Sequence, residues 1–190
     1  HAHPRVRAQE GGGHAPILRS LREVFSYRNT GLIFAINSGV CGCFLTFTGL
    51  WGVPFLSQHH GLSVKEAAFV TSAMLVVFAI ASPFAGALSD RWGSRKKPQV
   101  VGATMLLAGF GAMALFPAMP LALLVPLLLV ASVGAATMVI SFAYAKESVP
   151  THLQGTATGI ANTGVMTGTL TQMPVIGLLL DARWQGAIAN

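Results

Sequence analysis

The feature that most constrains this chain is a series of five long apolar runs that contain no charged side chain and no histidine. Short polar or charged segments separate the runs, which cover residues 32–56, 67–88, 100–116, 121–145 and 155–180. About 20 apolar residues in a helix cross the hydrocarbon core of a bilayer, so each run predicts a membrane-spanning helix. Only 9% of the 190 residues are charged, whereas soluble domains carry about 25%. The sequence therefore predicts an all-α, polytopic membrane bundle with five transmembrane helices.

The Lys and Arg residues are divided unevenly between the two sides of this predicted bundle. Ten of the twelve lie before the first run, after the second or after the fourth, and only Lys65 and Arg183 lie on the other side. Cytoplasmic loops are enriched in Lys and Arg, so we expect the N-terminal segment in the cytoplasm and residues 182–190 as an outer loop stub. A net charge of +6 that follows topology in this way does not indicate nucleic-acid binding, which needs a basic polar face.

Residues 1–29 are polar, basic and rich in glycine, and we expect a cytoplasmic linker here. Within it, the segment "ILRSLREVF" predicts a short amphipathic helix lying against a membrane surface or a protein. Its apolar face would hold Ile17, Leu18, Leu21, Val24 and Phe25. The chain begins with His1 and shows no signal-peptide pattern, so we expect a segment of a longer protein.

The loop "GALSDRWGSRKKP", between the second and third runs, concentrates four positive charges around a single Asp90. Membrane topology explains the positive charges but not the acid or the two glycines. Gly93 permits a tight turn, and Gly86 would let a neighbouring helix approach closely. Asp90 can pair with Arg91 or Arg95, or cap the following helix, so the loop could act as a clasp.

The spacing of this loop resembles the signature of the major facilitator superfamily, whose members transport solutes. Every signature position is filled, namely by Gly86, Asp90, Arg91, Gly93, Arg95 and Lys96. In that family the motif follows the second helix of each six-helix half and helps to lock the outward-facing state. The resemblance therefore implies a cytoplasmic gating role for Asp90, Arg91 and Arg95, and secondary transport of a small solute by alternating access.

Two further stretches, "FTGLWGVPFL" and "AKESVPTHLQGTATGIAN", resemble the seventh helix and the tenth-to-eleventh connection of bacterial members. The resemblance thus implies that residues 30–181 are helices seven to eleven of the C-terminal half, set in the cell membrane. The N-terminal half of the same transporter would be the main partner, beside the lipid bilayer and the solute. The first and fourth helices of each half line the central cavity in this family.

Polar and aromatic side chains recur on the faces that would line such a cavity. The candidates are Asn37, Cys41, Phe44, Thr48, Trp51, Thr137, Ser141, Tyr144, Asn162 and Gln172. An amide in hydrocarbon needs a partner or water, so interhelical hydrogen bonding and solute contact are both open for Asn37, Asn162 and Gln172. Trp51 and Tyr144 lie near the ends of their runs and could instead be interfacial belt residues.

Lys146 and Glu147 end the fourth run at the membrane level of the loop motif, and we expect them to form a charge network with it. No Asp, Glu, Lys, Arg or His lies inside a run, so a coupling group would have to lie elsewhere, or the carrier is a facilitator or uses another coupling ion. A membrane-embedded enzyme would need a nucleophile with a base, or metal ligands, inside the spans, so we expect no enzymatic activity. We likewise expect no metal site and no cofactor. His59 and His60 are expected in a solvated loop.

A membrane sensor or scaffold without transport is the alternative function.

Overall fold

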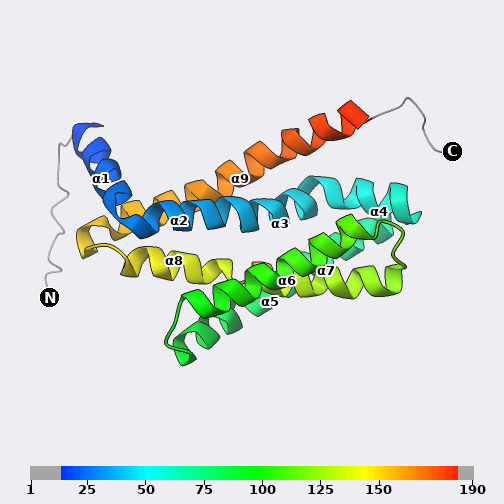
Figure 1. Ribbon diagram of the computed structural model, residues 1–190, viewed down its shortest axis with the longest axis horizontal. Coiled ribbons are helices and arrows are strands. Elements are labelled where there is room, and N and C mark those ends of the chain that lie inside the picture. Colours follow the sequence, from blue (N-terminus) through cyan, green and yellow to red (C-terminus); the bar gives the residue numbers. More distant parts are fainter. Residues whose placement is uncertain (1–13, 184–190) are drawn as a thin grey trace, which may run out of the picture.

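The computed structural model describes residues 14–183, which form helices joined by short turns (Figure 1). The helix α1 (His14–Ser26) precedes five helices that are long and apolar enough to cross a membrane, as predicted. The second span is α5 (Val64–Arg91) and the third is α6 (Lys96–Leu115). The fourth consists of α7 (Leu121–Ala135) and α8 (Met138–Glu147), and the fifth is α9 (Gln154–Arg183), after a 3-10 turn η3 (Thr151–Leu153).

The first span, Arg28–His60, is a continuous helix that is interrupted twice by π-helical turns. Its segments in order are α2 (Arg28–Ile36), η1 (Asn37–Cys41), α3 (Gly42–Thr46), η2 (Phe47–Trp51) and α4 (Gly52–His60). A π turn adds a residue to the helical repeat, so it shifts the face that the following residues present. The two π turns thus set which side chains of this span meet the rest of the bundle.

Local sequence signals account for the connection between the first two spans. The first span ends at Gly61, whose φ of 66° lies in the left-handed region. The hydroxyl of Ser63 then accepts a hydrogen bond from the Glu66 backbone at 3.3 Å, and the Glu66 carboxylate accepts one from the Ser63 backbone at 2.9 Å. This capping box fixes the start of α5 immediately after the turn.

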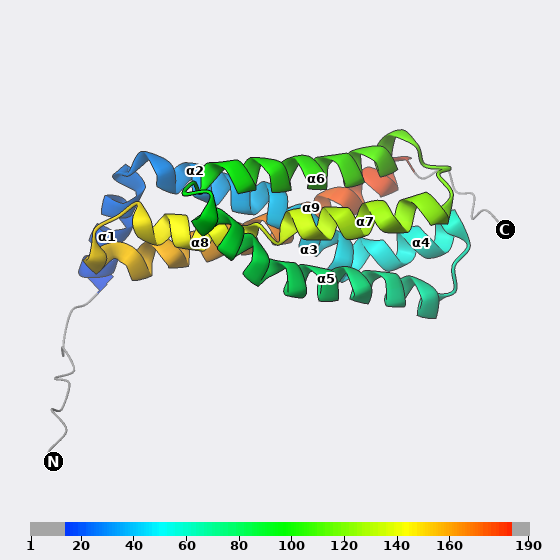
Figure 2. The same ribbon diagram turned by 90° about the horizontal axis from the view of Figure 1, so that it is seen from below.

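The connections alternate between two ends of the bundle (Figure 2). The helix α1, the α5–α6 loop and the α8–α9 connection lie toward one end, which we call the basic end because it carries most of the cations. The α4–α5 and α6–α7 connections lie toward the opposite end. Because successive spans run in opposite directions, the loop motif and the end of α8 both lie at the basic end of the bundle.

The amphipathic helix predicted near the N-terminus is present as α1, but its apolar face is only partly covered. Val24 is fully buried and Leu21 is partly buried in a cluster with Ile33, Ala145 and Leu153. Ile17, Leu18 and Phe25 remain exposed. The helix therefore packs on the protein through its last turns, while residues 1–13 of the expected linker lie outside the described residues.

Close backbone contact through glycine joins the first span to α9, a contact that we call the glycine seam. Gly164 lies against the backbone of Phe34, and Gly168 lies against the backbone of Ser38, so that a Cβ atom at either glycine would overlap main-chain atoms. Small residues permit such approach in lipid, where packing replaces the hydrophobic drive between helices. By contrast, added Cβ atoms at Gly155 and Gly159 of the same helix would meet no described residue within 4 Å.

Candidate gate and solute-facing surfaces

Arg95, at the end of the loop motif, connects the second span to the fourth. Its guanidinium donates two hydrogen bonds to the Glu147 carboxylate, from Nε at 3.0 Å and from Nη2 at 2.5 Å. Its Nη1 donates to Asp90 Oδ1 at 2.6 Å and to Ser89 Oγ at 3.0 Å. We call this group of Ser89, Asp90, Arg95 and Glu147 the Arg95 junction. The planar fork of arginine is suited to such bidentate contact with a carboxylate.

The turn between α5 and α6 places Arg95 for these contacts. Gly93 has a φ of 56°, as expected for a tight turn, and its backbone donates to the Asp90 carbonyl at 3.2 Å. Ser89 is almost completely buried, and its hydroxyl donates to the Ser94 carbonyl at 3.2 Å while accepting from Arg95. Sequence reasoning missed Ser89, although its position beside Asp90 on the last turn of α5 could have indicated it.

The structure brings only some of the predicted gate residues together. Asp90, Arg95 and Glu147 meet, whereas Arg91, Lys96 and Lys146 form no ion pair among residues 14–183. The expected close helix approach at Gly86 is wrong for the described residues, because a Cβ atom there would meet nothing within 4 Å. The junction is thus smaller than the motif, with one arginine held between two acids.

The Arg95 junction is largely accessible to solvent. The side chain of Arg95 is 24% exposed, that of Asp90 68% and that of Glu147 50%. Hydrogen bonds from the guanidinium to Glu147 and then to Asp90 raise the pKa of Arg95, so it stays charged. Exposed ion pairs contribute roughly 0.2–1 kcal/mol each, because water and salt screen them. The contacts are therefore specific in geometry but easily broken.

The first-span candidates for a cavity lie inside this bundle rather than on an open surface. Asn37, Cys41, Phe44 and Thr48 are all buried. Asn37 Nδ2 donates to the Ala161 carbonyl of α9 at 3.0 Å, and the Phe44 ring stacks on Phe78 with centroids 5.3 Å apart. The Thr48 hydroxyl donates to the Phe44 carbonyl of its own helix at 2.9 Å. The contacts of Asn37 and Phe44 join the first span to other helices, as the interhelical interpretation of the amide expects, whereas that of Thr48 stays within its own helix.

Two more candidates extend the contact between the first span and α9. Gln172 Nε2 donates to the Ser38 carbonyl at 2.9 Å, and Trp51 Nε1 donates to the Met173 carbonyl at 3.2 Å. The Ser38 carbonyl belongs to the first π turn, where the helical ladder is altered. The glutamine amide therefore bonds directly to the backbone of this π turn.

The fourth-span candidates contact the third span or lie near the basic end. Ser141 is buried, and its hydroxyl accepts a hydrogen bond from Gln99 Nε2 of α6 at 2.6 Å. Thr137 lies between α7 and α8, and its hydroxyl donates to the Gly134 carbonyl at 2.8 Å. Tyr144 is partly exposed and lines a groove with Arg28 and Lys96. Gln99, which the sequence did not single out, thus joins two spans near the Arg95 junction.

Asn162 differs from the other candidates, because it is exposed in a wide hollow between α8 and α9 that we call the polar hollow. The hollow has a volume of about 820 Å³ and is open to the surface. Its polar lining comes from Lys146, Thr151, Gln154, Thr158 and Asn162, with Phe142 and the two open glycines Gly155 and Gly159. Lys146 therefore faces a different surface from its neighbour Glu147. Its lining provides hydrogen-bond donors and one cation, and the two glycines leave space, so the hollow can admit a small polar solute.

A comparison of the sequence with protein-family models matches residues 32–189 to the model of the Major Facilitator Superfamily. This match covers the first span from residue 32 onward, the other four spans, the Arg95 junction and the polar hollow. The chain belongs to the Major Facilitator Superfamily. It is accordingly a multi-pass membrane protein of a transporter family.

Three curated transport proteins are similar to the chain over most of its length. Monocarboxylate transporter 11 of Homo sapiens is 35% identical over 160 residues, which are 82% of this chain and 32% of that protein. The Mus musculus protein of the same name is 34% identical over 160 residues, 82% of this chain and 34% of that protein. A metabolite transport protein of Bacillus subtilis is 29% identical over 140 residues, 72% of this chain and 30% of that protein. The chain thus spans about a third of these relatives, and no solved structure matches it.

The described part of the chain offers few side chains that could bind a metal or a cofactor. Within residues 14–183, no three His, Cys, Asp or Glu side chains gather as metal ligands would. His59 and His60 lie on the last turn of α4, where their rings pack on Phe55 with centroids 5.2 and 5.4 Å from it. Cys41 is buried and Cys43 partly buried, and both are free thiols.

Proposed function

We propose that this chain is part of a carrier that moves a small solute across the cytoplasmic membrane by alternating access. In this proposal the Arg95 junction is the cytoplasmic gate. The observation that supports it best is the bidentate contact of Arg95 with Glu147, combined with its contact to Asp90. One side chain thereby joins the end of α5, the start of α6 and the end of α8 at one level.

The energetic character of the junction suits a gate. Its pairs are exposed, so each costs about 1 kcal/mol or less to break. A carrier must exchange two states whose free energies differ by only a few kcal/mol. Contacts of this size bias such an equilibrium without locking it, and we propose that they favour the state in which the cytoplasmic side is closed.

We also propose that the five spans are helices seven to eleven of a C-terminal half, with residues 30–181 as its bundle. Residues 1–29 would be the cytoplasmic linker from an N-terminal half, which completes the cavity, and residues 182–190 would lie outside. The Lys and Arg residues gathered at the basic end support this orientation. The position of α1 against that same end, through Val24, supports the linker assignment.

The polar hollow supports a solute that carries a carboxylate. Lys146 provides a cation there, while Thr158 and Asn162 provide polar groups on successive turns of α9. Two relatives are named for monocarboxylates, and a third for metabolites in general. Since the apolar runs of the five spans contain no Asp, Glu, Lys, Arg or His, any site for a coupling ion would lie outside these runs, in the other half of the carrier.

Uptake by the full-length carrier in proteoliposomes tests the function, with a panel of radiolabelled small carboxylates and neutral metabolites. We expect uptake of a carboxylate, slowed severalfold in Asp90→Asn and more in Arg95→Gln, with normal insertion of both variants. Lys65→Gln, at the opposite end, is the matched charge control and should transport normally. Normal rates in both junction variants would contradict the gate. A wild-type protein that carries no solute of the panel would instead favour the sensor or scaffold alternative.

Lys146→Gln tests the substrate class separately. We expect it to slow uptake of a carboxylate severalfold and to leave uptake of a neutral solute unchanged, because only the charged solute uses the cation. Equal effects on both classes would contradict the anion assignment while leaving the gate unaffected.

A further inference from the structure

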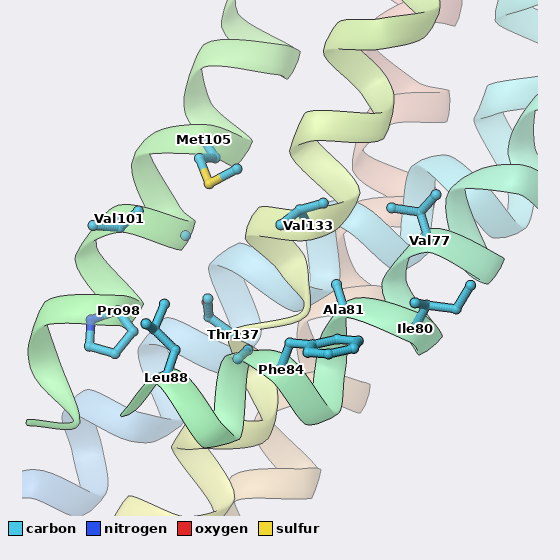
Figure 3. A pocket seen from close by; sticks show the side chains of 12 residues that line it. Val77, Ile80, Ala81, Phe84, Leu88, Pro98, Val101, Met105, Val133 and Thr137 are labelled. Carbon is cyan, nitrogen blue, oxygen red and sulfur yellow. The ribbon is translucent and has the colours of Figure 1, made fainter. Parts of the chain in front are cut away.

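An apolar groove lies on the surface of the bundle between α5 and α6, beside the loop motif but separate from the polar hollow (Figure 3). It has a volume of about 400 Å³, and its floor comes from Val133 and Thr137, where α7 passes into α8. The one hydroxyl in its lining, on Thr137, already donates to the Gly134 carbonyl. The groove therefore offers no free polar group to a solute, and its natural occupant is a hydrocarbon chain.

The two walls of the groove end at cationic residues. On α5 the lining residues Phe84 and Leu88 share a helical face with Arg91, which follows three residues after Leu88. On α6 the lining residue Val101 shares a face with Lys97, which lies four residues before it. Figure 3 shows Ile80 and Phe84 on one side of the groove and Val101 and Met105 on the other, with Leu88 between them.

The charge at this end of the groove is not compensated within the described part of the chain. Asp90 and Glu147, the acids of the Arg95 junction, are both in contact with Arg95. Arg91 and Lys97 are exposed and form no ion pair among residues 14–183. The indole of Trp92, also exposed, lies between them in sequence, and tryptophan is typical of the headgroup level of a membrane.

We propose that this groove is a binding site for an anionic phospholipid. One acyl chain fills the groove between α5 and α6, and the phosphate is held by Arg91 and Lys97. A lipid phosphate pairs with both cations, whereas an apolar helix of the rest of the carrier would leave them unpaired, so charge complementarity favours the lipid as the occupant. Because Arg91 is on the same helical turn as Ser89 and Asp90, the bound headgroup lies next to the Arg95 junction.

Native mass spectrometry of the purified full-length carrier tests the site, with phosphatidylglycerol and phosphatidylcholine of identical chains as probes. A cation near a membrane surface contributes about fivefold to the affinity for an anionic lipid. We therefore expect Arg91→Gln combined with Lys97→Gln to weaken phosphatidylglycerol binding about 25-fold and to leave phosphatidylcholine binding unchanged. Lys65→Gln, which removes a charge at the opposite end, should change neither. Unchanged phosphatidylglycerol binding in the double variant would overturn the headgroup assignment.

Two independent measurements test whether the acyl chain occupies the groove. Ala81→Trp fills the groove from α5 and should weaken both lipids severalfold, whereas unaltered binding would contradict the groove as the site. A photoreactive benzoyl-phenylalanine at position 101 should form adducts with lipid in the membrane. Adducts with another part of the carrier, or with a second copy, would show that protein covers the groove and would overturn the proposal. Neither measurement depends on transport, so failure of the lipid site is distinguishable from failure of the proposed carrier function.

Discussion

The glycine seam and the Arg95 junction both join distant parts of the chain, but they do so by opposite means. At the seam, Gly164 and Gly168 of α9 lie directly against the backbone of the first span, with no charge nearby. At the junction, long charged side chains cross between α5 and α8 through contacts that solvent can reach. Steep repulsion at backbone distance makes the first kind of contact rigid, whereas screening makes the second kind weak.

This difference indicates which parts of the bundle move together. The hydrogen bonds of Asn37, Trp51 and Gln172 all lie between the first span and α9, so they reinforce the glycine seam. The first span and α9 therefore form one rigid pair in the described structure. Change of shape is easier at the basic end, where the Arg95 junction joins α5 and α6 to α8.

The largest effect is expected from Gly168→Leu. A side chain at this position would overlap the Ser38 carbonyl, which belongs to backbone and cannot turn away. Overpacking of this kind costs about 1–3 kcal/mol or more, so we expect a clearly lower melting temperature of the purified carrier in detergent. The control is Gly111→Leu on α6, where a Cβ atom would meet no described residue within 4 Å. Equal melting temperatures of the two variants would refute the rigid seam.

A smaller effect is expected from Gln172→Leu. The variant loses one interhelical hydrogen bond to the Ser38 carbonyl but keeps the glycine contact. Such bonds contribute about 0.6 kcal/mol on average and up to about 1.7 kcal/mol in membrane bundles. Thr163→Val is the matched control, because its hydroxyl bonds only within its own helix, to the Gly159 carbonyl. A loss of stability as large as that of Gly168→Leu would mean that the seam depends on the amide rather than on glycine.

The smallest effect on stability is expected from Arg95→Gln, even though this variant should slow transport most among the junction variants. The exposed pairs contribute about 1–2 kcal/mol together at most. The effect should also shrink at high ionic strength, because salt screens charges of this kind. Melting curves at low and high salt measure this directly. A loss of several kcal/mol that salt does not change would make the Arg95 junction a structural contact and not a gate.

The sequence predicted the five spans and the turn at Gly93, because hydropathy and glycine chemistry act locally. For Asp90 it left Arg91, Arg95 and a helix cap open, and the structure selects Arg95. The sequence did not predict the two π turns of the first span, because no local sequence signal marks them; each holds a side chain that bonds to α9, namely Asn37 and Trp51. The expected network also joined both Lys146 and Glu147 to the loop motif, although neighbours on a helix point about 100° apart. Glu147 accordingly faces Arg95, while Lys146 faces the polar hollow.

The close approach expected at Gly86 was wrong for a related reason. Sequence shows where glycine permits contact, but not which glycines have a neighbour. Gly168 meets the first span, whereas Gly86, Gly155 and Gly159 have open space above them in the described structure. Only the tertiary arrangement separates a glycine that packs from one that lines a surface.

The central claim is that the Arg95 junction opens while the glycine seam stays closed, and pulsed electron spin resonance tests it most directly. Spin-label pairs at positions 87 and 151 would span the junction, and pairs at positions 50 and 178 would span the seam, in a full-length carrier with Cys41 and Cys43 replaced by Ser. We predict that Arg95→Gln shifts or broadens the distance distribution of the first pair and leaves that of the second unchanged. An unchanged distribution across the junction, or equal broadening across both contacts, would contradict the claim.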